Sequence, residues 1–358
     1  MEKGTYRILA INPGSTSTKI GIFENRTCKS ERVIRHKVKE LEGFSTVSEQ
    51  KDLRTRYIEE FLSEEQVNPS ELDAVVGRGG LIRPLDSGTY LINQKMLEDL
   101  SGKSANQHAS ALGGIIAAEL GKKYEIPAYT VDPVVVDEMD PLAKLSGIPG
   151  VERRSVFHAL NAKAVARSCA VSLGMKYEDG RFVVAHMGGG ISVGAHRYGR
   201  VIDVNDALYG EGPFSPERSG GVPLYQLVEM CFSGHYTKDE LLSMITKRGG
   251  MLAYLGTNNL KEVEDMIRKG DEFAALVMDS MAYQVSKDIG AMVAVLEGRV
   301  NAIVLTGGLA YSTRFTGAIK QRVDQIAPVL TIPGENEMSA LADGVLRVLS
   351  GAEKAAEY

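Results

Sequence analysis

Two similar turns rich in glycine and serine, at residues 12–18 and 186–192, each follow a short apolar run. They lie about half the length of this 358-residue chain apart. A repeat at that distance predicts a chain built as two α/β halves that bind one ligand between them. Small side chains allow backbone N–H groups to converge on an anion, and the simplest such anion is a nucleotide phosphate.

Length, charge and cysteine content narrow the classes of protein. A chain of 358 residues exceeds the usual size of one domain, so two cores are expected. The net charge of −5 provides no basic field for nucleic acid or an anionic membrane, and neither is expected as a partner. Three widely separated cysteines predict neither a disulfide framework nor a cysteine-based zinc site. The sequence shows no signal peptide and no apolar run of the ~18 residues that span a bilayer, which predicts a cytoplasmic protein.

The hydrophobic pattern predicts a mixed α/β chain. Apolar and β-rich runs predict strands near residues 6–11, 18–23, 73–76, 127–131, 181–186, 192–197, 200–204 and 300–305, and a charged strand is expected near 30–38. Helical spacing predicts helices near residues 47–62, 109–122, 155–173, 271–297 and 338–350. Irregular segments are interpreted as a hinge at 141–150, a functional loop at 205–223 and a frayed tail at 351–358.

Neither of the common phosphate-binding fingerprints is present. The segment 102–104 lacks the earlier glycine of a P-loop, and the segment 188–190 lacks the third glycine of a dinucleotide-binding turn. Three glycine-rich strand ends remain, at 12–18, 188–192 and 307–308. Each alone is compatible with a plain tight turn, but the three together favour a phosphate site. The candidate phosphate-binding residues are Asn12, Ser15, Thr16, His186, Gly188, Gly189, Gly190, Gly307 and Gly308.

Charged residues next to these turns suit phosphate chemistry. Arg78 lies in a Gly-Arg-Gly-Gly segment and Arg218 in an Arg-Ser-Gly-Gly segment, where a guanidinium can bind carboxylate or phosphate with two hydrogen bonds. Asp132 follows a strand and Glu337 precedes the last helix, and one or two such carboxylates hold Mg²⁺ in proteins. The competing interpretations are solvated surface arginines, a helix cap and surface acids.

Three histidines are candidates for contact with a ligand. His186 precedes the second glycine turn and His158 lies at the start of a helix, where either could donate a hydrogen bond to a phosphoryl oxygen. A structural histidine with satisfied hydrogen bonds is the competing interpretation for both, and His108 is a weaker candidate. No pair has the spacing of a zinc site. The remaining histidines are expected at the surface: His36, His196 and His235.

Taken together, these segments resemble the acetokinase family of acetate, propionate and butyrate kinases, with butyrate kinases as the most similar members, within the actin-like ATPase superfamily. The turn at 12–19 is similar to the family's first phosphate motif and the segment 186–192 to its second. Four further segments follow in the family's order, at residues 77–80, 131–133, 218–221 and 336–337.

The resemblance implies a duplicated ribonuclease-H-like fold with an active-site cleft between two domains. The first domain would comprise residues 1–145 and 340–358, and the second, on the nucleotide side, residues 146–339. ATP and Mg²⁺ are implied, with the metal held through Asp132 and Glu337 partly by water, and so is a homo-oligomer, a dimer or larger. The implied catalytic residues are Arg78, Arg218, Asp132, Glu337 and His158, and the implied substrate-binding residues are Arg78, Gly79, Gly80 and His108.

The implied reaction is reversible phosphorylation of a carboxylate, ATP + butyrate ⇌ ADP + butyryl phosphate, by direct in-line transfer. Acetate kinases have two valines after the arginine that Arg78 matches, whereas this chain has Gly79 and Gly80, which favours an acid longer than acetate. They also have a histidine at the position of Asn161, and their adenine-side segment differs from residues 256–261. Three alternatives stay open: an acetate or propionate kinase, a sugar kinase of the same superfamily, and a non-catalytic actin-like nucleotide switch.

Overall fold

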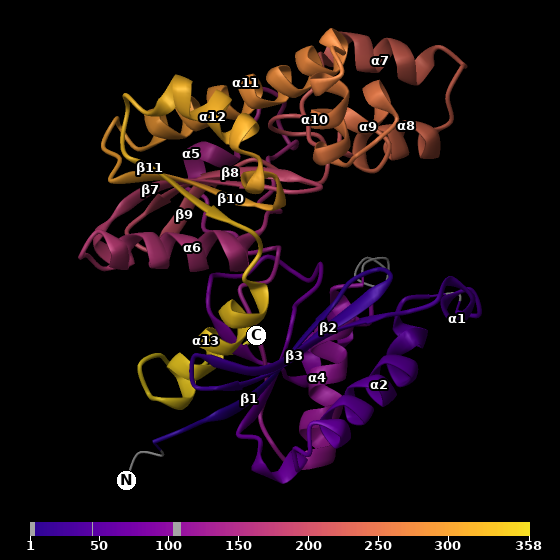
Figure 1. The fold of residues 1–358 in the computed structure, drawn as a ribbon, viewed down its shortest axis with the longest axis vertical. Coiled ribbons are helices and arrows are strands. Elements are labelled where there is room, and N and C mark those ends of the chain that lie inside the picture. Colours follow the sequence, from indigo (N-terminus) through magenta and orange to yellow (C-terminus); the bar gives the residue numbers. More distant parts are fainter. Residues whose placement is uncertain (1–3, 45, 103–108) are drawn as a thin grey trace. The chain divides into compact units, whose positions relative to one another are not determined.

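The computed structural model describes residues 4–44, 46–102 and 109–358. The chain divides into two compact units, Met1–Val136 with Asn336–Tyr358, and Asp137–Glu335. Each unit is built around one β-sheet that is covered by helices (Figure 1). Glu337 falls in the first unit, together with Asn12, Arg78 and Asp132.

The described part of the first unit contains six strands: β1 (Arg7–Pro13), β2 (Ser17–Glu24), β3 (Thr27–Arg35), β4 (Ala74–Gly77), β5 (Thr89–Leu91) and β6 (Ala128–Val131). Their order in the sheet is β3-β2-β1-β4-β6-β5. β1 and β2, which match the strands predicted near 6–11 and 18–23, form an antiparallel hairpin, and β3 extends it. β1, β4 and β6 are parallel, so the residues that follow these three strands lie along one edge of the sheet.

The helices of the first unit are α1 (Val38–Leu41), α2 (Lys51–Glu64), α3 (Gln94–Leu100), α4 (Ala111–Tyr124) and α13 (Glu337–Leu349), with 3₁₀ turns at Ser48–Gln50 and Pro69–Glu71. α2 and α4 share a buried cluster with Ile20 and Ile22 of β2. Gly21, between these two residues, faces the other side, where Met338 of α13 approaches it. Both faces of the sheet are therefore covered, which explains why residues 8–11 of β1 form an uninterrupted apolar run.

The second unit repeats the same order of strands. Its described strands are β7 (Arg181–Met187), β8 (Ile191–Arg197), β9 (Arg200–Val204), β10 (Ala302–Gly307) and β11 (Val329–Pro333), arranged β11-β10-β7-β8-β9. β7, β8 and β9 are antiparallel, whereas β10 and β11 are parallel to β7. This arrangement matches β6-β4-β1-β2-β3, so the predicted duplication of an α/β unit is confirmed.

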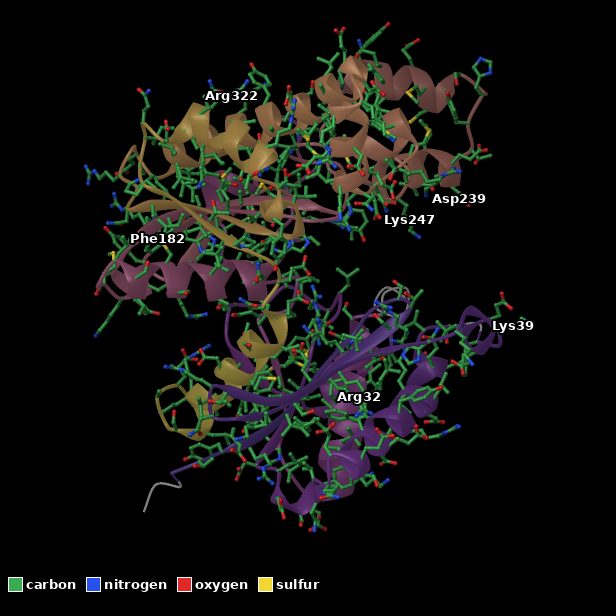
Figure 2. The ribbon with its side chains drawn as sticks, viewed as in Figure 1. Arg32, Lys39, Phe182, Asp239, Lys247 and Arg322 are labelled. Atoms are coloured by element: carbon green, nitrogen blue, oxygen red, sulfur yellow. The ribbon has the colours of Figure 1, made fainter. Side chains whose placement is uncertain are left out.

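The helices of the second unit are α5 (Pro141–Lys144), α6 (Ala159–Ser172), α7 (Leu224–Phe232), α8 (Lys238–Thr246), α9 (Gly250–Leu255), α10 (Leu260–Arg268), α11 (Glu272–Val295) and α12 (Thr313–Val323), with 3₁₀ turns at Tyr177–Asp179 and Gly308–Tyr311. α11 and α12 cover one face of the sheet and share a buried cluster with Val183. Phe182, labelled in Figure 2, is the neighbour of Val183 on β7 and faces the side that α6 covers.

The predicted frayed tail is wrong. The backbone N–H of Ala356 donates to the carbonyl of Thr89 at 2.8 Å, which places the tail beside β5. The Tyr358 hydroxyl donates to Oδ2 of Asp99 at 2.5 Å, and the Arg83 guanidinium lies 5.2 Å from the centre of the Tyr358 ring. A tail that gains backbone pairing and an aromatic anchor is held in place despite its polar composition.

Two histidines expected at the surface are buried instead. His36 is 6% exposed and His196 is 0% exposed, and each ring is hydrogen-bonded, to Thr18 and to Tyr177 respectively. The four short helices from α7 to α10 were not predicted either. None of the helices within the described ranges combines the length and apolar character that crossing a bilayer requires.

Candidate functional site

Three polar side chains of the first unit meet where β1 and β4 end and α13 begins. Nη1 of Arg78 donates a hydrogen bond to Oε2 of Glu337 at 2.7 Å, and Nδ2 of Asn12 donates to the same oxygen at 2.6 Å. Glu337 is 4% exposed, whereas the Arg78 side chain keeps 21% of its surface. The carboxylate thus anchors the guanidinium and leaves part of it open to a ligand.

Glycines fix the backbone that carries Arg78. Its N–H donates to the carbonyl of Ile11 on β1, and its own carbonyl accepts from Gly114 at the start of α4. A Cβ added at Gly113 would lie 2.5 Å from the Arg78 carbonyl oxygen, and one at Gly77 would lie 1.9 Å from the carbonyl oxygen of Gly113. Only glycine allows strand and helix to approach so closely, and the approach sets the direction of the Arg78 side chain.

The packing at Gly79 and Gly80 corrects the expectation that these glycines vacate space for a longer acid. A Cβ at Gly79 would lie 2.7 Å from Cβ of Pro133, and one at Gly80 would lie 2.8 Å from Cα of Ala111. The space that side chains would fill is therefore occupied by protein. The glycines instead let the backbone after Arg78 lie directly against the end of β6 and the start of α4.

Asp132 follows β6 in a backbone conformation that non-glycine residues seldom adopt, with φ of +38°. It is 3% exposed, and its Oδ1 accepts hydrogen bonds from the Ser87 hydroxyl at 2.6 Å and the Gly88 N–H at 2.9 Å. These donors hold the carboxylate in one orientation at the edge where β1, β4 and β6 end.

The two carboxylates fit the donor chemistry of a magnesium ion. Asp132 and Glu337 are buried carboxylates, one directly after β6 and the other at the start of α13. Mg²⁺ takes one or two carboxylate oxygens and completes its shell with water and phosphate. Across residues 4–44, 46–102 and 109–358, no group of three or more His, Cys, Asp or Glu side chains is placed to hold a metal.

The first glycine turn exposes the residues predicted to contact phosphate. Ser15 and Thr16 lie at its exposed tip, and the N–H of Gly14 donates to the carbonyl of Ser17 at 2.7 Å to close the turn. The turn directly follows Asn12, so the Arg78 and Glu337 cluster and the turn are neighbours along β1.

In the second unit, His186 is fully buried at the end of β7. Its Nδ1 accepts a hydrogen bond from Nδ2 of Asn161 at 2.9 Å, which leaves the ring proton on Nε2, and Nε2 donates to Oε1 of Glu335 at 3.1 Å. The His158 ring stacks on His186 with centroids 3.8 Å apart and planes at 9°. His158 also bonds the Ser192 hydroxyl at 3.1 Å. Both candidate histidines and Asn161 thus belong to one cluster, in which Nε2 of His186 is a donor suited to an anionic oxygen.

Arg218 and the second glycine turn are in direct contact. A Cβ added at Gly190 would lie 1.8 Å from Nη1 of Arg218, so the guanidinium passes where a side chain would otherwise be. Nη1 donates to the carbonyl of Ala207 at 2.6 Å. The Ser215 hydroxyl donates to the carbonyl of Gly189 at 2.6 Å and accepts from the Arg218 N–H at 3.1 Å. The loop predicted to be functional is therefore fastened to the glycine turn.

The Arg218 guanidinium remains available for an anion. Burial lowers its pKa, and the nearby Glu217 and Asp206 carboxylates raise it again. A guanidinium stays charged under these opposing effects at neutral pH. Its Nε is buried and has no hydrogen-bond partner within the described residues. A buried donor without a partner is costly, and a ligand oxygen would satisfy it.

Of the two glycines at the end of β10, packing requires a glycine at position 307 but not at position 308. Gly307 has φ of +88°, and a Cβ there would lie 2.4 Å from the carbonyl oxygen of Met187. Gly308 has open space at the same place, with no atom within 4 Å. A ligand can therefore approach the backbone at Gly308.

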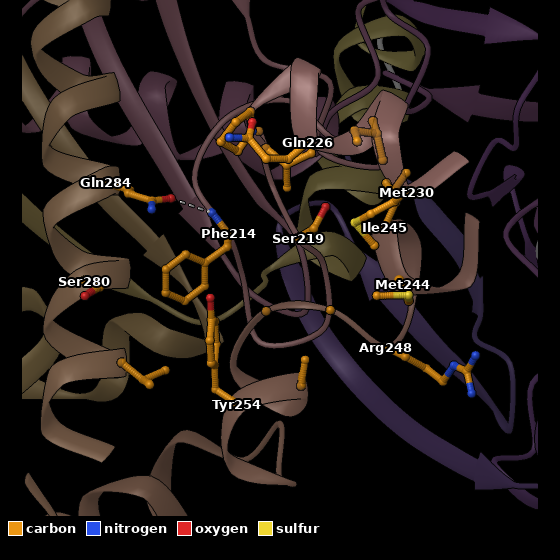
Figure 3. A pocket seen from close by; sticks show the side chains of 18 of the residues that line it. Phe214, Ser219, Gln226, Met230, Met244, Ile245, Arg248, Tyr254, Ser280 and Gln284 are labelled. Atoms are coloured by element: carbon orange, nitrogen blue, oxygen red, sulfur yellow. Dashed lines mark hydrogen bonds between the residues drawn. The ribbon is translucent and has the colours of Figure 1, made fainter. Parts of the chain in front are cut away.

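A cavity of about 670 Å³ lies next to the loop that carries Arg218 (Figure 3). α7, α8, α9 and α11 contribute to its largely apolar lining, and Oε1 of Gln284 accepts a hydrogen bond from the Phe214 N–H there at 3.1 Å. Ser219 lines it, but none of the predicted site residues does. The cavity is thus separate from the phosphate chemistry described above.

Sequence reasoning missed several residues that support the site. Glu335 and Thr306 contact the His186 and Asn161 cluster, and Arg54 binds the first glycine turn. Glu335 could have been noticed, because it lies two residues before Glu337 in the same short segment. The predicted substrate residue His108 lies outside the described residues.

Comparison with known proteins identifies the family of this chain and similar folds among solved structures. The sequence model of the acetokinase family matches residues 144–340, more than half of the chain. The chain is similar to the acetate kinase of Porphyromonas gingivalis, with a TM-score of 0.77 at 20% identity over 95% of this chain and 99% of that one. It is also similar to a propionate kinase from Francisella tularensis subsp. tularensis, with a TM-score of 0.75 at 19% identity over 95% and 98% of the two chains. At these identities the structural likeness shows the fold, which spans almost the whole chain.

Proposed function

The chain belongs to the acetokinase family, whose members are ATP-dependent carboxylate kinases, and on that premise we propose that its acceptor is butyrate or a related short- or branched-chain acid. The proposed reaction is ATP + butyrate ⇌ ADP + butyryl phosphate, by direct in-line transfer of the γ-phosphoryl group. Acetate and propionate are the alternative acceptors, and the family supports them equally.

The observation that carries the proposal is the anchored but partly open guanidinium of Arg78. A carboxylic acid is already ionised at pH 7, so its phosphorylation needs a cation to hold the carboxylate and no base to activate it. Arg78 offers that cation, because Glu337 and Asn12 fix its position from behind. Asp132 is held by Ser87 and Gly88, and the proposal gives it no role as a base.

In the proposed mechanism the protein positions the reactants and neutralises charge. Arg78 binds the acceptor carboxylate, and Arg218 donates to the oxygens of the moving phosphoryl group. Nε2 of His186 would donate there as well once a phosphoryl oxygen replaces the Glu335 carboxylate as its acceptor. The backbone N–H groups of the glycine turns at 14–17 and 188–190 bind the phosphates. Asp132 and Glu337 would hold Mg²⁺ together with water. The metal, when bound, adds positive charge at the phosphate oxygens.

The preference for an acid longer than acetate rests on the backbone after Arg78. Because Gly79 and Gly80 lie directly against Pro133 and Ala111, no side chain stands between this segment and the body of the unit. The proposal therefore rests on the absence of the two valine side chains that follow the matching arginine in acetate kinases, and not on vacated volume at Gly79 and Gly80. Each additional buried CH₂ of the acid would then contribute ~0.8 kcal/mol to binding.

Trapping with hydroxylamine tests the proposal, because it converts acyl phosphates to coloured hydroxamates and does not react with sugar phosphates. We expect ATP-dependent hydroxamate formation with acids in a series from acetate to hexanoate, with the highest kcat/KM beyond acetate. If acetate gives the highest turnover, the protein is still a carboxylate kinase, but the assignment of butyrate as its acceptor is contradicted. ADP formation with a sugar but with no acid would indicate a sugar kinase, and ATP binding without either would indicate a nucleotide switch.

We also propose that the enzyme acts as a homo-oligomer in the cytoplasm. Apolar side chains on α7 support an oligomer, since Leu224, Tyr225 and Phe232 are 73%, 73% and 87% exposed. Light scattering of the purified protein tests the oligomer, and a purely monomeric protein at micromolar concentration would contradict it.

A further inference from the structure

Arg54 on α2 is a fully buried arginine whose guanidinium binds the first glycine turn. Its side chain has 0% exposure. Nη1 donates to the carbonyl oxygens of Gly14 and Ser17, each at 2.9 Å, and Nη2 donates to the carbonyl oxygen of Ser15 at 3.1 Å. A single side chain therefore holds three of the four carbonyl groups of residues 14–17. Its other hydrogen bonds go to Oγ1 of Thr18 and Oε1 of Gln50.

The fourth carbonyl group of the turn is also hydrogen-bonded within the unit. The carbonyl of Thr16 accepts a hydrogen bond from the N–H of His36 at 2.9 Å. In a trans peptide the N–H of each residue points opposite to the preceding carbonyl. The N–H groups of Ser15, Thr16 and Ser17 therefore point away from these partners, at a tip where Ser15 and Thr16 are exposed. Successive outward N–H groups form a concave site for an anion.

The charge of Arg54 is compensated by no carboxylate within the described residues, since its partners there are carbonyl, hydroxyl and amide oxygens. Burial lowers the pKa of Arg54 to about 10, so the side chain is charged at pH 7. His36 does not add a second positive charge, because burial and the neighbouring Arg54 guanidinium lower the pKa of its imidazole. An enclosed charge without a counter-ion is costly to the free protein, and an anion at the turn would offset that cost.

We propose that Arg54 is a positioning residue for the polyphosphate of the nucleotide. It draws the carbonyl groups of residues 14–17 inward, which aims the N–H groups of Ser15, Thr16 and Ser17 at a phosphate, and it supplies positive charge from behind the turn. The inference rests on the proposed nucleotide substrate and deepens it. It does not depend on which acid is phosphorylated.

Binding of tripolyphosphate and of adenosine to three variants tests this role. Arg54→Met keeps the length of the side chain without its charge, and Arg54→Lys keeps the charge without the planar fork. Thr55→Val is the matched control, because Thr55 is the buried neighbour on α2 and its hydroxyl has no partner within the described residues. We expect Arg54→Met to weaken tripolyphosphate binding about tenfold or more and to raise KM for ATP, while adenosine binding and KM for the acid stay unchanged. Arg54→Lys should bind tripolyphosphate with intermediate affinity, and Thr55→Val should match the wild type.

Other outcomes overturn the inference. The inference is contradicted if a folded Arg54→Met protein binds tripolyphosphate as tightly as the wild type. It is also contradicted if this variant loses equal affinity for adenosine and for tripolyphosphate. If Arg54→Met does not fold, Arg54→Lys decides by the same comparison with the wild type. A wild-type protein that binds tripolyphosphate but forms no hydroxamate contradicts the acid kinase alone. A wild type that binds no tripolyphosphate contradicts the role of Arg54.

Discussion

Arg78 and Glu337 are separated by 259 residues, yet Nη1 of the arginine lies 2.7 Å from Oε2 of the glutamate. The pair joins the end of β4 to the first residue of α13, and Asn12 at the end of β1 donates to the same oxygen. Removing one partner from so enclosed a pair leaves the other without compensation, which makes the pair a sensitive point for both activity and folding.

Replacing Glu337 by Gln should lower kcat about 10²–10³-fold, because the amide keeps the size of the side chain but no longer anchors Arg78 with a charge. The Mg²⁺ concentration for half-maximal rate should rise as well. Hydroxamate formation across a magnesium titration measures both. Asp343→Asn is the control and should keep the wild-type rate, because Asp343 is a partly exposed carboxylate of the same helix that pairs with Arg26 and Arg347 and not with Arg78. A Glu337→Gln enzyme with the wild-type rate and magnesium requirement would refute the assigned role.

Adding one methyl group at Gly190 should inactivate the enzyme almost as fully as Arg218→Ala. The new Cβ would lie 1.8 Å from Nη1 of Arg218 and would displace the guanidinium, with an expected loss of about 10²–10³ in kcat for either variant. The matched control is Gly189→Ala, whose Cβ would lie 3.6 Å from Oε2 of Glu217, an ordinary contact distance. It should keep most of the activity. Equal activities of the Gly189→Ala and Gly190→Ala enzymes would contradict the proposed path of the Arg218 side chain.

Replacing Asp288 by Asn should stabilise the protein at pH 7. Burial raises the pKa of Asp288 from 3.8 to about 6, with Lys287 and Arg153 lowering it and Glu211 raising it. Between these pH values the folded state binds more protons than the unfolded state, so the free energy of unfolding falls as pH rises through the window. The Asp288→Asn protein lacks this pH-dependent loss of stability. We therefore expect its free energy of unfolding to exceed that of the wild type by on the order of 2 kcal/mol at pH 7, and the difference to shrink towards pH 4.

Urea unfolding of the Asp288→Asn protein at pH 4 and pH 7 measures this difference. Asp279→Asn on an exposed part of the same helix is the control and should behave as the wild type at both pH values. A stability gain of the Asp288 variant that is equal at both pH values would point to packing and not to ionisation.

Replacing Gly79 by Val should destabilise the protein more than it changes acid preference. The added Cβ would lie 2.7 Å from Cβ of Pro133, and such overpacking costs about 1–3 kcal/mol. Thermal unfolding together with kcat/KM across the acid series separates the two effects. Unchanged stability with a shift towards acetate would instead favour a vacated side-chain pocket at Gly79.

Local sequence patterns predicted much of the fold, because the buried strands and the first hairpin follow directly from apolar runs and turn residues. The strand order of each sheet was not predicted, because it depends on parallel pairing between segments far apart in the chain, such as β1 with β4 and β7 with β10. The helices from α7 to α10 escaped prediction because each is short, six to nine residues. The tail at 351–358 has a polar sequence, and its ordered position depends on pairing with β5, which lies far away in the sequence.

The sequence indicated the charged and glycine residues of the candidate site but not the residues that support them. Arg78, Arg218 and the glycine turns carry local signals, because charge among glycines suits a ligand. Arg54 and Glu335 carry none of that kind, since each acts through a contact with a distant segment. Gly79 and Gly80 were noticed for a missing side chain, although their packing partners Pro133 and Ala111 explain them better.

The position of α13 in the chain determines which of the two units can fold first during synthesis. The second unit is one continuous segment, Asp137–Glu335, and can fold as it leaves the ribosome. The first unit begins earlier but lacks α13, and with it the glutamate that anchors Arg78, until the second unit has been made. A chain released early would therefore carry both glycine turns but no anchored arginine. An incomplete copy of this protein should bind phosphate weakly and transfer none.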